Sequence, residues 1–353
     1  MSFGPEAVSE AAADAVSQPA ATLDPVTMSA VERDSVSEVA GRLARILLGR
    51  DRTVTDPSAS ELEFEPVLEP RPLATPGPAP EVWAVDGGQA LVADARCLQV
   101  FVTRSATVCF RDGRCVVEEE GPLRAHLLGT GETGGGAAGE LPEGASVDVN
   151  LLRDRAEWEA VAGAVDRAAP GSVILLDGDL VPDWRIPPDL VPEMLARAAG
   201  RGVALAAVTK HSSLARGGAP LIGQLEVEAA ERFGPRRRWW VPVGRTREGS
   251  RWPELQVVVA RLDPDARYAF RVDLPAGADP EAVLGALAAV SDDAAFPGYP
   301  YPLSVADRLA ACPGWLRAET WLALDEALEQ AGVSAEARER AFDDRHRLME
   351  RHR

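Results

Sequence analysis

Residues 82–88 read VWAVDGG and residues 172–180 read SVILLDGDL, and the predicted fold rests on these two stretches. Each is a run of apolar residues that ends at an aspartate followed by glycine, which is typical of a short buried strand that ends in a turn at the glycine. Ligands of an open α/β sheet lie beyond the carboxyl ends of its strands. If the two strands are neighbours, Asp86 and Asp177 therefore project side by side from one edge of the sheet.

The segments around these strands extend the α/β pattern. In chain order they are strands at 97–110 and 115–120 in an antiparallel meander with short turns such as 111–113, a helix at 150–168, a helix closed by Gly200, a buried strand at 203–210, and helices from about Leu303 and Leu322. This order predicts an RNase H-like α/β fold, in which a mixed sheet of antiparallel meander plus parallel strands is flanked by helices. Many α/β folds share parts of this order.

The chain is expected to have one main domain with extensions at both ends. The predicted parts are a disordered N-terminus at 1–28, an amphipathic helix and Pro-rich extended linker at 29–80 with the helix over 29–50, a main domain at 81–325, and a C-terminal helical tail at 326–353. Within the main domain, residues 217–290 show no clear pattern. We expect this region to be an insertion that supplies part of a dimer or partner surface.

Composition indicates a soluble, cytoplasmic protein. The chain is 46% hydrophobic and 26% charged, and no run approaches the roughly 18 uncharged apolar residues that a membrane span needs. We see no signal-peptide pattern at the N-terminus. The four cysteines form no CxxC pair, so buried or idle thiols are expected, and four scattered histidines argue against a His-based zinc site.

The formal net charge of −18 limits how the chain can bind nucleic acid. Phosphate contacts require Lys and Arg, so the acidic balance argues against tight, non-specific DNA binding by this chain alone. It does not exclude a basic groove. A carboxylate-lined metal site would also add negative charge that bound cations neutralise.

The paired aspartates carry the candidate chemistry. Two adjacent carboxylates repel each other unless a cation lies between them, and Mg²⁺ or Mn²⁺ prefers oxygen ligands. Asp307, near the start of a late helix, could complete the cluster, as could Glu157 or Glu159 on the helix before the second strand. The alternatives are turn-forming aspartates, solvated helical glutamates, and a first-turn Asp307 favoured by the helix dipole.

Two basic features could contact phosphate. Lys210 ends the third buried strand and could meet a transition-state charge, or it could be an ordinary exposed lysine. The second feature is the run Arg236, Arg237, Arg238, Trp239 and Trp240, the most concentrated positive charge in the chain. Arginine beside aromatic residues suits single-stranded nucleic acid, but the same residue types are also enriched at protein interfaces.

Five segments resemble, in order, the signature segments of the NurA nuclease family. They are AVDGG at 84–88, RDRAEWEA at 153–160, ILLDGDL at 174–180, AVTKHSS at 207–213 and GYPYPLSVADRLA at 298–310. The resemblance covers about residues 80–312. It implies an RNase H-like fold and a manganese-dependent nuclease, with 5′→3′ exonuclease and single-strand endonuclease activity on DNA ends. The family acts in end resection and double-strand break repair, usually as a homodimer docked on a hexameric HerA-type ATPase translocase.

The resemblance also assigns residues. Asp86 and Asp177 match the family's strand acids, Glu157 best matches its helix glutamate with Glu159 as the alternative, and Lys210 matches its strand-end lysine. Either Tyr299 or Tyr301 matches the active-site tyrosine. There are two departures: the first motif reads Asp-Gly-Gly where Asp-Gly-Ser is common, and Asp307 stands where a histidine ligand is frequent.

The sequence therefore predicts a metal-dependent deoxyribonuclease. Asp86, Glu157, Asp177 and Asp307 would hold Mn²⁺ or Mg²⁺, Lys210 and a tyrosine would contact the phosphate, and the Arg236–Trp240 run would bind DNA. Two other functions compete with this prediction: a catalytically inactive docking module that keeps the fold, and a metal-dependent phosphoesterase acting on another substrate.

Overall fold

The computed structural model describes residues 30–57, 61–95, 97–129, 147–181, 183, 185–248, 250 and 252–342. The chain divides into two compact units, Met1–Arg50 and Asp51–Arg353. The first unit contains helix α1 (Ala30–Leu47), as predicted. The N-terminus predicted as disordered lies outside the described residues.

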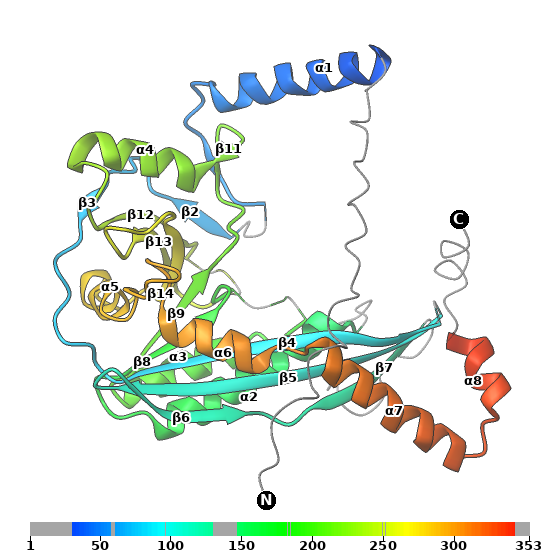
Figure 1. The fold of residues 1–353 in the computed structure, drawn as a ribbon. Coiled ribbons are helices and arrows are strands. Elements are labelled where there is room, and N and C mark those ends of the chain that lie inside the picture. The colour runs from blue at the N-terminus through cyan, green and yellow to red at the C-terminus, as the bar shows by residue number, and fades with distance from the viewer. Residues whose placement is uncertain are drawn as a thin grey trace, which may run out of the picture. The chain divides into compact units, whose positions relative to one another are not determined.

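The second unit is built on one large mixed sheet (Figure 1). Its strands, in spatial order, are β2 (Leu62–Phe64), β12 (Trp239–Thr246), β13 (Leu255–Arg261), β14 (Phe270–Pro275), β9 (Ala204–Thr209), β8 (Val173–Asp177), β4 (Val82–Asp94), β5 (Leu98–Arg111) and β6 (Arg114–Glu120), with β3 (Arg71–Pro72) paired to β12 and β7 (Arg124–Gly129) paired to β5. The β4–β8 and β8–β9 pairs are parallel, and the other pairs are antiparallel. The predicted mixture of meander and parallel strands is confirmed.

Local chemistry explains where several elements turn or begin. The turn between β5 and β6 places Asp112 and Gly113 at φ values of 51° and 71°, the left-handed region that Asp-Gly favours in a tight hairpin. Helix α2 (Val149–Arg167) begins where the Asp148 carboxylate accepts a bond from the Leu151 N–H at 3.0 Å. A small second sheet contains β1 (Val54–Thr55), β10 (Ala215–Arg216) and β11 (Ala219–Pro220).

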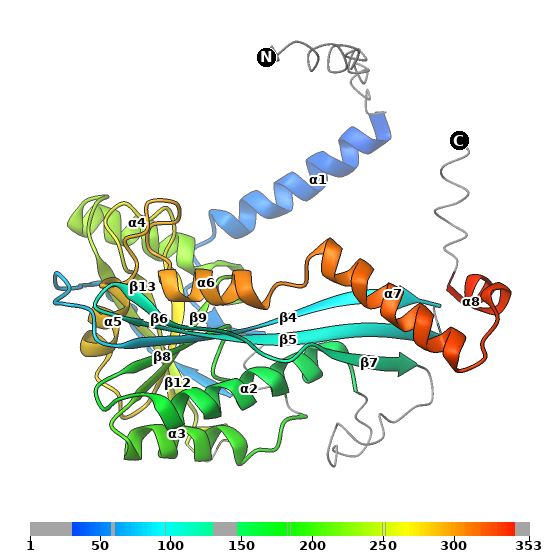
Figure 2. The same cartoon turned by 60° about the horizontal axis from the view of Figure 1, so that its bottom comes forward.

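Helices cover both faces of the large sheet (Figure 2). Helix α2 and α3 (Leu190–Gly200) pack on one face, and α5 (Pro280–Ala288) and α6 (Tyr301–Ala310) pack on the other. Helix α4 (Leu221–Phe233) packs on the β12–β13 end of the sheet. Helices α7 (Gly314–Gln330) and α8 (Ala335–Phe342) complete the described chain. Among these described helices, none is long and apolar enough to cross a membrane.

The strand that carries Asp86 does not end there, so the turn predicted at Gly87 and Gly88 is wrong. Strand β4 continues to Asp94, and the two glycines stay in register with Ser105 and Arg104 of β5. The parallel pairing with β8 does stop just before Asp86, at Val85. The glycines therefore mark where one neighbouring strand ends, and not where β4 turns.

Two expected boundaries also change. Residues 217–290 are not an insertion, because β12, β13 and β14 lie inside the large sheet and their apolar side chains form much of its core. Part of the predicted linker forms β1, β2 and β3, which pair with β10 or β12. The boundary predicted at 325/326 falls within α7.

Candidate metal centre

Three aspartates from three elements meet on the α6 side of the sheet. Val85 of β4 is in register with Leu176 of β8, so the next residues, Asp86 and Asp177, lie level with each other. Helix α6 supplies Asp307. Each aspartate offers one carboxylate oxygen, and these three oxygens all lie within 4.8 Å of one another. The structure thus brings together three of the four predicted metal ligands.

Lys210, directly after β9, neutralises part of this cluster. Its Nζ lies 2.5 Å from an Asp177 oxygen and 2.8 Å from an Asp307 oxygen. Burial opposes the charge on Lys210, but the two carboxylates outweigh it and raise the pKa of the amine above its usual value. Lys210 is thus held as a cation that bridges two carboxylates of the cluster.

Asp86 is the buried member of the three acids. Burial and the nearby Asp177 charge raise its pKa to about 7, although the Gly87 N–H donates to its carboxylate at 2.7 Å. Three carboxylates facing one ammonium leave a surplus of negative charge in a site that runs from the buried Asp86 to the exposed Asp307. A divalent cation is the natural counter-charge, and a donor set made only of carboxylate oxygens suits Mg²⁺ or Mn²⁺.

Tyr299 and Tyr301 are placed very differently. Tyr299 is 3% exposed, and Lys210 Nζ lies 5.4 Å from the centre of its ring. Burial and the neighbouring Asp177 raise the pKa of its phenol, and among the described residues the hydroxyl has no hydrogen-bond partner of good geometry. Tyr301 is exposed and packs edge-on against Phe110. Of the two candidates, Tyr299 is therefore the one beside the metal centre.

Glu157 lies on the α2 side of β4 and outside the three-aspartate cluster. Its carboxylate occupies the place that a side chain at Gly87 would take, because a Cβ there would fall 2.3 Å from Glu157 Oε1. Arg153, one helical turn earlier, has its Nε 3.2 Å from the same oxygen. Burial, opposed by Arg153 and reinforced by Asp154 and Asp86, raises the pKa of Glu157 to about 8. The alternative, Glu159, is exposed and pairs with Arg124, so it is away from the centre.

The two glycines after Asp86 let both helices approach β4. Glu157 and Arg153 of α2 lie against Gly87, and the end of α6 lies against Gly88, where a Cβ would fall 1.9 Å from the Ala310 carbonyl oxygen. The contact with Ala310 gives a physical reason for glycine at position 88, where the first NurA motif commonly has serine. Sequence reasoning missed the role of Arg153, for which the spacing of four residues to Glu157 was the available signal.

The stacking role predicted for Trp239 and Trp240 is wrong. Both lie in β12 and are buried, 1% and 4% exposed, within the cores on the two faces of the sheet. Arg238 is turned to the Leu262 carbonyl oxygen and Asp263. Arg236 and Arg237 are exposed. Of this predicted DNA-binding run, only these two arginines remain available to a ligand.

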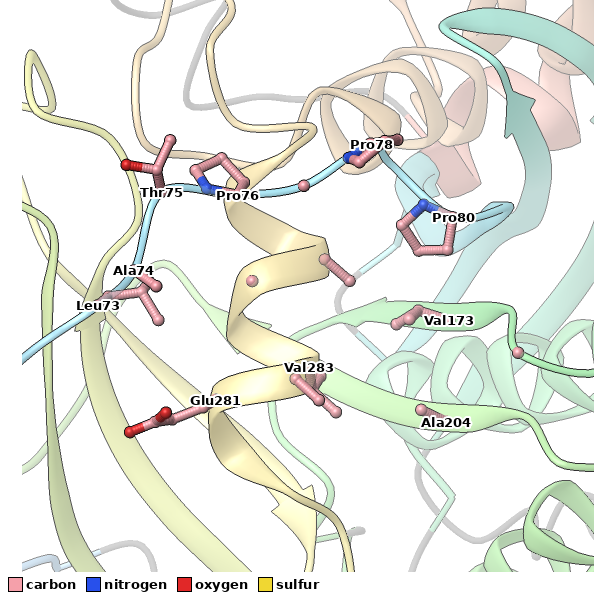
Figure 3. Close-up of a pocket in the computed structure, with 15 residues that line it drawn as sticks. Leu73, Ala74, Thr75, Pro76, Pro78, Pro80, Val173, Ala204, Glu281 and Val283 are labelled. Carbon is pink, nitrogen blue, oxygen red and sulfur yellow. The ribbon is translucent and has the colours of Figure 1, made fainter.

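A separate cavity of about 430 Å³ lies far from the acids, between residues 73–80 and α5 (Figure 3). It reaches Val173 and Ala204, at the opposite ends of β8 and β9 from Asp177 and Lys210. Its lining is mostly Ala, Gly, Pro and Val, with Glu281 as its one carboxylate. The cavity thus offers no set of groups resembling the metal centre.

The mixed sheet with parallel and antiparallel strands and the helices on both of its faces define an RNase H-like α/β fold. More particularly, the fold is that of the NurA nucleases. The crystal structure of the NurA nuclease from Sulfolobus solfataricus is similar over 86% of this chain and 98% of that chain, with a TM-score of 0.54 and 16% identity. A second NurA crystal structure is similar over 80% of this chain and 94% of that chain, with a TM-score of 0.51 and 9% identity.

No protein-family model and no curated protein sequence matches this chain. The resemblance seen in the five sequence segments is confirmed at the level of the fold. A shared fold hosts many functions, so this likeness establishes the fold and not the reaction.

Proposed function

We propose that this protein is a metal-dependent nuclease that hydrolyses phosphodiester bonds in DNA. The observation that carries the proposal is the cluster of Asp86, Asp177 and Asp307 with Lys210 bridging two of its members. The two similar crystal structures, both of NurA, support the same reaction class.

Each residue of the centre has a proposed role. Asp86, Asp177 and Asp307 would hold Mn²⁺ or Mg²⁺. Glu157, on the α2 side of β4, contributes no full negative charge at neutral pH, because burial raises its pKa to about 8. The chemistry that such an ion supplies when bound is activation of a water molecule and stabilisation of the leaving 3′-oxygen. Lys210 offsets charge on the reacting phosphate, and the buried Tyr299 hydroxyl orients that phosphate.

The DNA strand is proposed to follow the edge of the sheet toward Arg236 and Arg237. The registers Asp177↔Val208, Arg271↔Thr209, Ala260↔Phe270 and Trp239↔Arg261 place the start of β12 at the same edge as the metal centre. Strands β9, β14 and β13 lie between β8 and β12, which makes four strand spacings of about 4.8 Å, so the start of β12 lies roughly 20 Å from Asp177 along this edge. That span corresponds to a few nucleotides of extended single strand.

The finer parts of the proposal come from the family resemblance. They are cutting of DNA ends as a 5′→3′ exonuclease and single-strand endonuclease, a role in end resection and double-strand break repair, a homodimer, docking on a HerA-type hexameric ATPase, and a cytoplasmic location. The acidic balance of the chain supports a translocase partner, since a nuclease fed by a translocase need not bind DNA tightly itself.

The direct test is a nuclease assay on end-labelled linear DNA with Mn²⁺, Mg²⁺ or EDTA. We expect cutting that requires metal and that Asp86→Asn and Asp177→Asn abolish while the protein stays folded. Cleavage of a small phosphate ester with no cleavage of DNA would favour the phosphoesterase. A wild-type protein that is inert with every metal, alone and with the ATPase, would overturn the proposal in favour of a docking module.

A further inference from the structure

A buried ionic network lies next to the metal centre and uses none of its ligands. Arg271 of β14 is 1% exposed and donates from Nε and Nη2 to the two oxygens of Asp273, at 2.7 and 3.0 Å. Its Nη1 donates to Asp56 at 2.8 Å. Asp273 is fully buried and Asp56 is 5% exposed. Asp56 comes from the segment between α1 and β2, more than two hundred residues away from Arg271 in the sequence.

One side of this network holds the turn that follows Asp177. Asp273 Oδ2 accepts a bond from the Leu180 N–H at 3.2 Å. Within the same turn, Gly178 N–H donates to the Val208 carbonyl at 3.1 Å, and the Thr209 hydroxyl donates to the Gly178 carbonyl at 2.6 Å. The backbone on both sides of Gly178 is therefore fixed, which restricts where the preceding Asp177 can point.

The other side holds the residues that follow Lys210. The Ser213 hydroxyl donates to Asp56. Strand β1, which ends just before Asp56, pairs with β10, which begins shortly after Ser213. Val54 lies opposite Arg216, and Thr55 lies opposite Ala215. Asp56 is thus tied both to Arg271 and to the chain that leads away from Lys210.

Buried charges are costly unless they are fully paired, and apolar residues could hold these strands together as well. A guanidinium group fixes the orientation of its partners, which apolar packing does not, because its donors pair with a carboxylate in one geometry. We infer that Asp56, Arg271 and Asp273 are positioning residues that set the Asp177 turn and the Lys210 loop relative to each other. The expected effect on DNA cleavage rests on the proposed nuclease function. The expected effect on the positions of the two segments rests on the contacts alone.

The experiment measures amide hydrogen exchange and DNA cleavage on the same full-length variants. We expect Asp56→Asn to speed exchange in peptides covering 177–181 and 210–214 by about tenfold without metal or DNA. We expect its kcat to fall by about tenfold to a hundredfold, since small misplacements of reacting groups have effects of this size, while KM for DNA changes less than about twofold. Asp325→Asn is the matched control: it takes a carboxylate from another buried arginine, Arg338, and should change neither measurement.

A milder variant and a double mutant guard against simple misfolding. Ser213→Ala removes only one donor to Asp56 and should speed exchange in 210–214 more than in 177–181. If Asp56 acts through Lys210, then adding Asp56→Asn to Lys210→Met should lower kcat by much less than the product of the two single effects.

Three results would overturn the inference. One is unchanged exchange in both segments of Asp56→Asn. Another is faster exchange with an unchanged kcat in an active enzyme. The third is a kcat loss fully multiplicative with that of Lys210→Met. If the wild type cuts no DNA at all, the proposed function fails, and the exchange measurement still decides whether Asp56 holds the two segments.

Discussion

Replacing Gly88 with alanine should damage the metal centre from a position that carries no ligand. The added Cβ would fall 1.9 Å from the Ala310 carbonyl oxygen and 2.6 Å from its carbonyl carbon. Unstrained contacts between such atoms begin near 3.4 Å, so the end of α6 must move by roughly 1.5 Å. Ala310 lies one turn after Asp307, whose carbonyl accepts the Ala311 N–H at 3.0 Å. The displacement should therefore reach the third ligand.

The expected loss has two parts. Overpacking should lower the free energy of unfolding by about 1–3 kcal/mol, measured by urea denaturation in EDTA. Moving Asp307 should weaken Mn²⁺ binding by about tenfold to a hundredfold, measured by titration calorimetry, as for other disturbances around metal ligands. The control is Gly163→Ala in α2, where a Cβ meets nothing within 4 Å. It should stabilise the helix by up to about 1 kcal/mol and leave Mn²⁺ binding unchanged.

The reasoning would be refuted by a Gly88→Ala protein with wild-type stability and wild-type Mn²⁺ affinity. A protein with lower stability but unchanged Mn²⁺ affinity would show that α6 yields without carrying Asp307 along.

Three further predictions concern other parts of the molecule. Burial opposes ionisation of Glu81, but bonds from the Trp83 indole, Arg111, the Ala169 N–H and the Ser172 hydroxyl outweigh it and lower its pKa to about 2. Because the folded pKa lies below the unfolded one, ionised Glu81 stabilises the fold above about pH 4.5 and loses this effect as the pH falls toward 2. Glu81→Gln should then reduce the free energy of unfolding by about 2–3 kcal/mol at pH 7 and by much less near pH 2.5, in urea titrations at both pH values; an equal loss at both would contradict the assignment. Replacing Arg236 and Arg237 together with alanine should weaken single-stranded DNA binding. Fluorescence anisotropy should show that the steepness of log affinity against log salt falls by about one to two. An unchanged steepness would mean that the DNA strand does not contact these two arginines. The proposed dimer surface within 217–290 can be tested at Val227, an apolar side chain on α4 that is 58% exposed. Val227→Glu should shift the protein toward monomer in light scattering, and an unchanged dimer would place the interface elsewhere.

The strand-end acids could be predicted from the sequence because their positions depend on local pattern. An apolar run that stops at Asp-Gly identifies both Asp86 and Asp177, and sheet geometry then places them together. The place of Asp307 one turn into a late helix makes it a candidate only, and the family resemblance matches it to the late-helix ligand. The same local reading placed a turn at Gly87, because glycine signals both a turn and a close approach by another element. The close packing of Glu157 against Gly87 and of Ala310 against Gly88 shows that these glycines allow a close approach and do not form a turn.

Other features depend on contacts between distant parts of the chain. Trp239 and Trp240 beside three arginines have the composition of a nucleic-acid surface, and only the packing of helices on both faces of β12 buries them. Asp56 has the sequence context of an ordinary loop acid, and only the folded structure brings it to Arg271. Residues 217–290 show no clear pattern because β12 to β14 are buried on both faces and lack the polar alternation of a half-exposed strand. They pair in sequence order with each other, and only the outer pairs, β12 with β2 and β3 and β14 with β9, join them to distant parts of the chain.

The spacing of the three ligands along the chain has a consequence during synthesis. Asp86 and Asp307 are about 220 residues apart, and α6 is the last element to join the centre. A nascent chain that is still missing α6, or one cut short by a premature stop, carries only two of the three aspartates. The proposed metal centre would then assemble only late in translation, so that a half-made chain carries no complete centre.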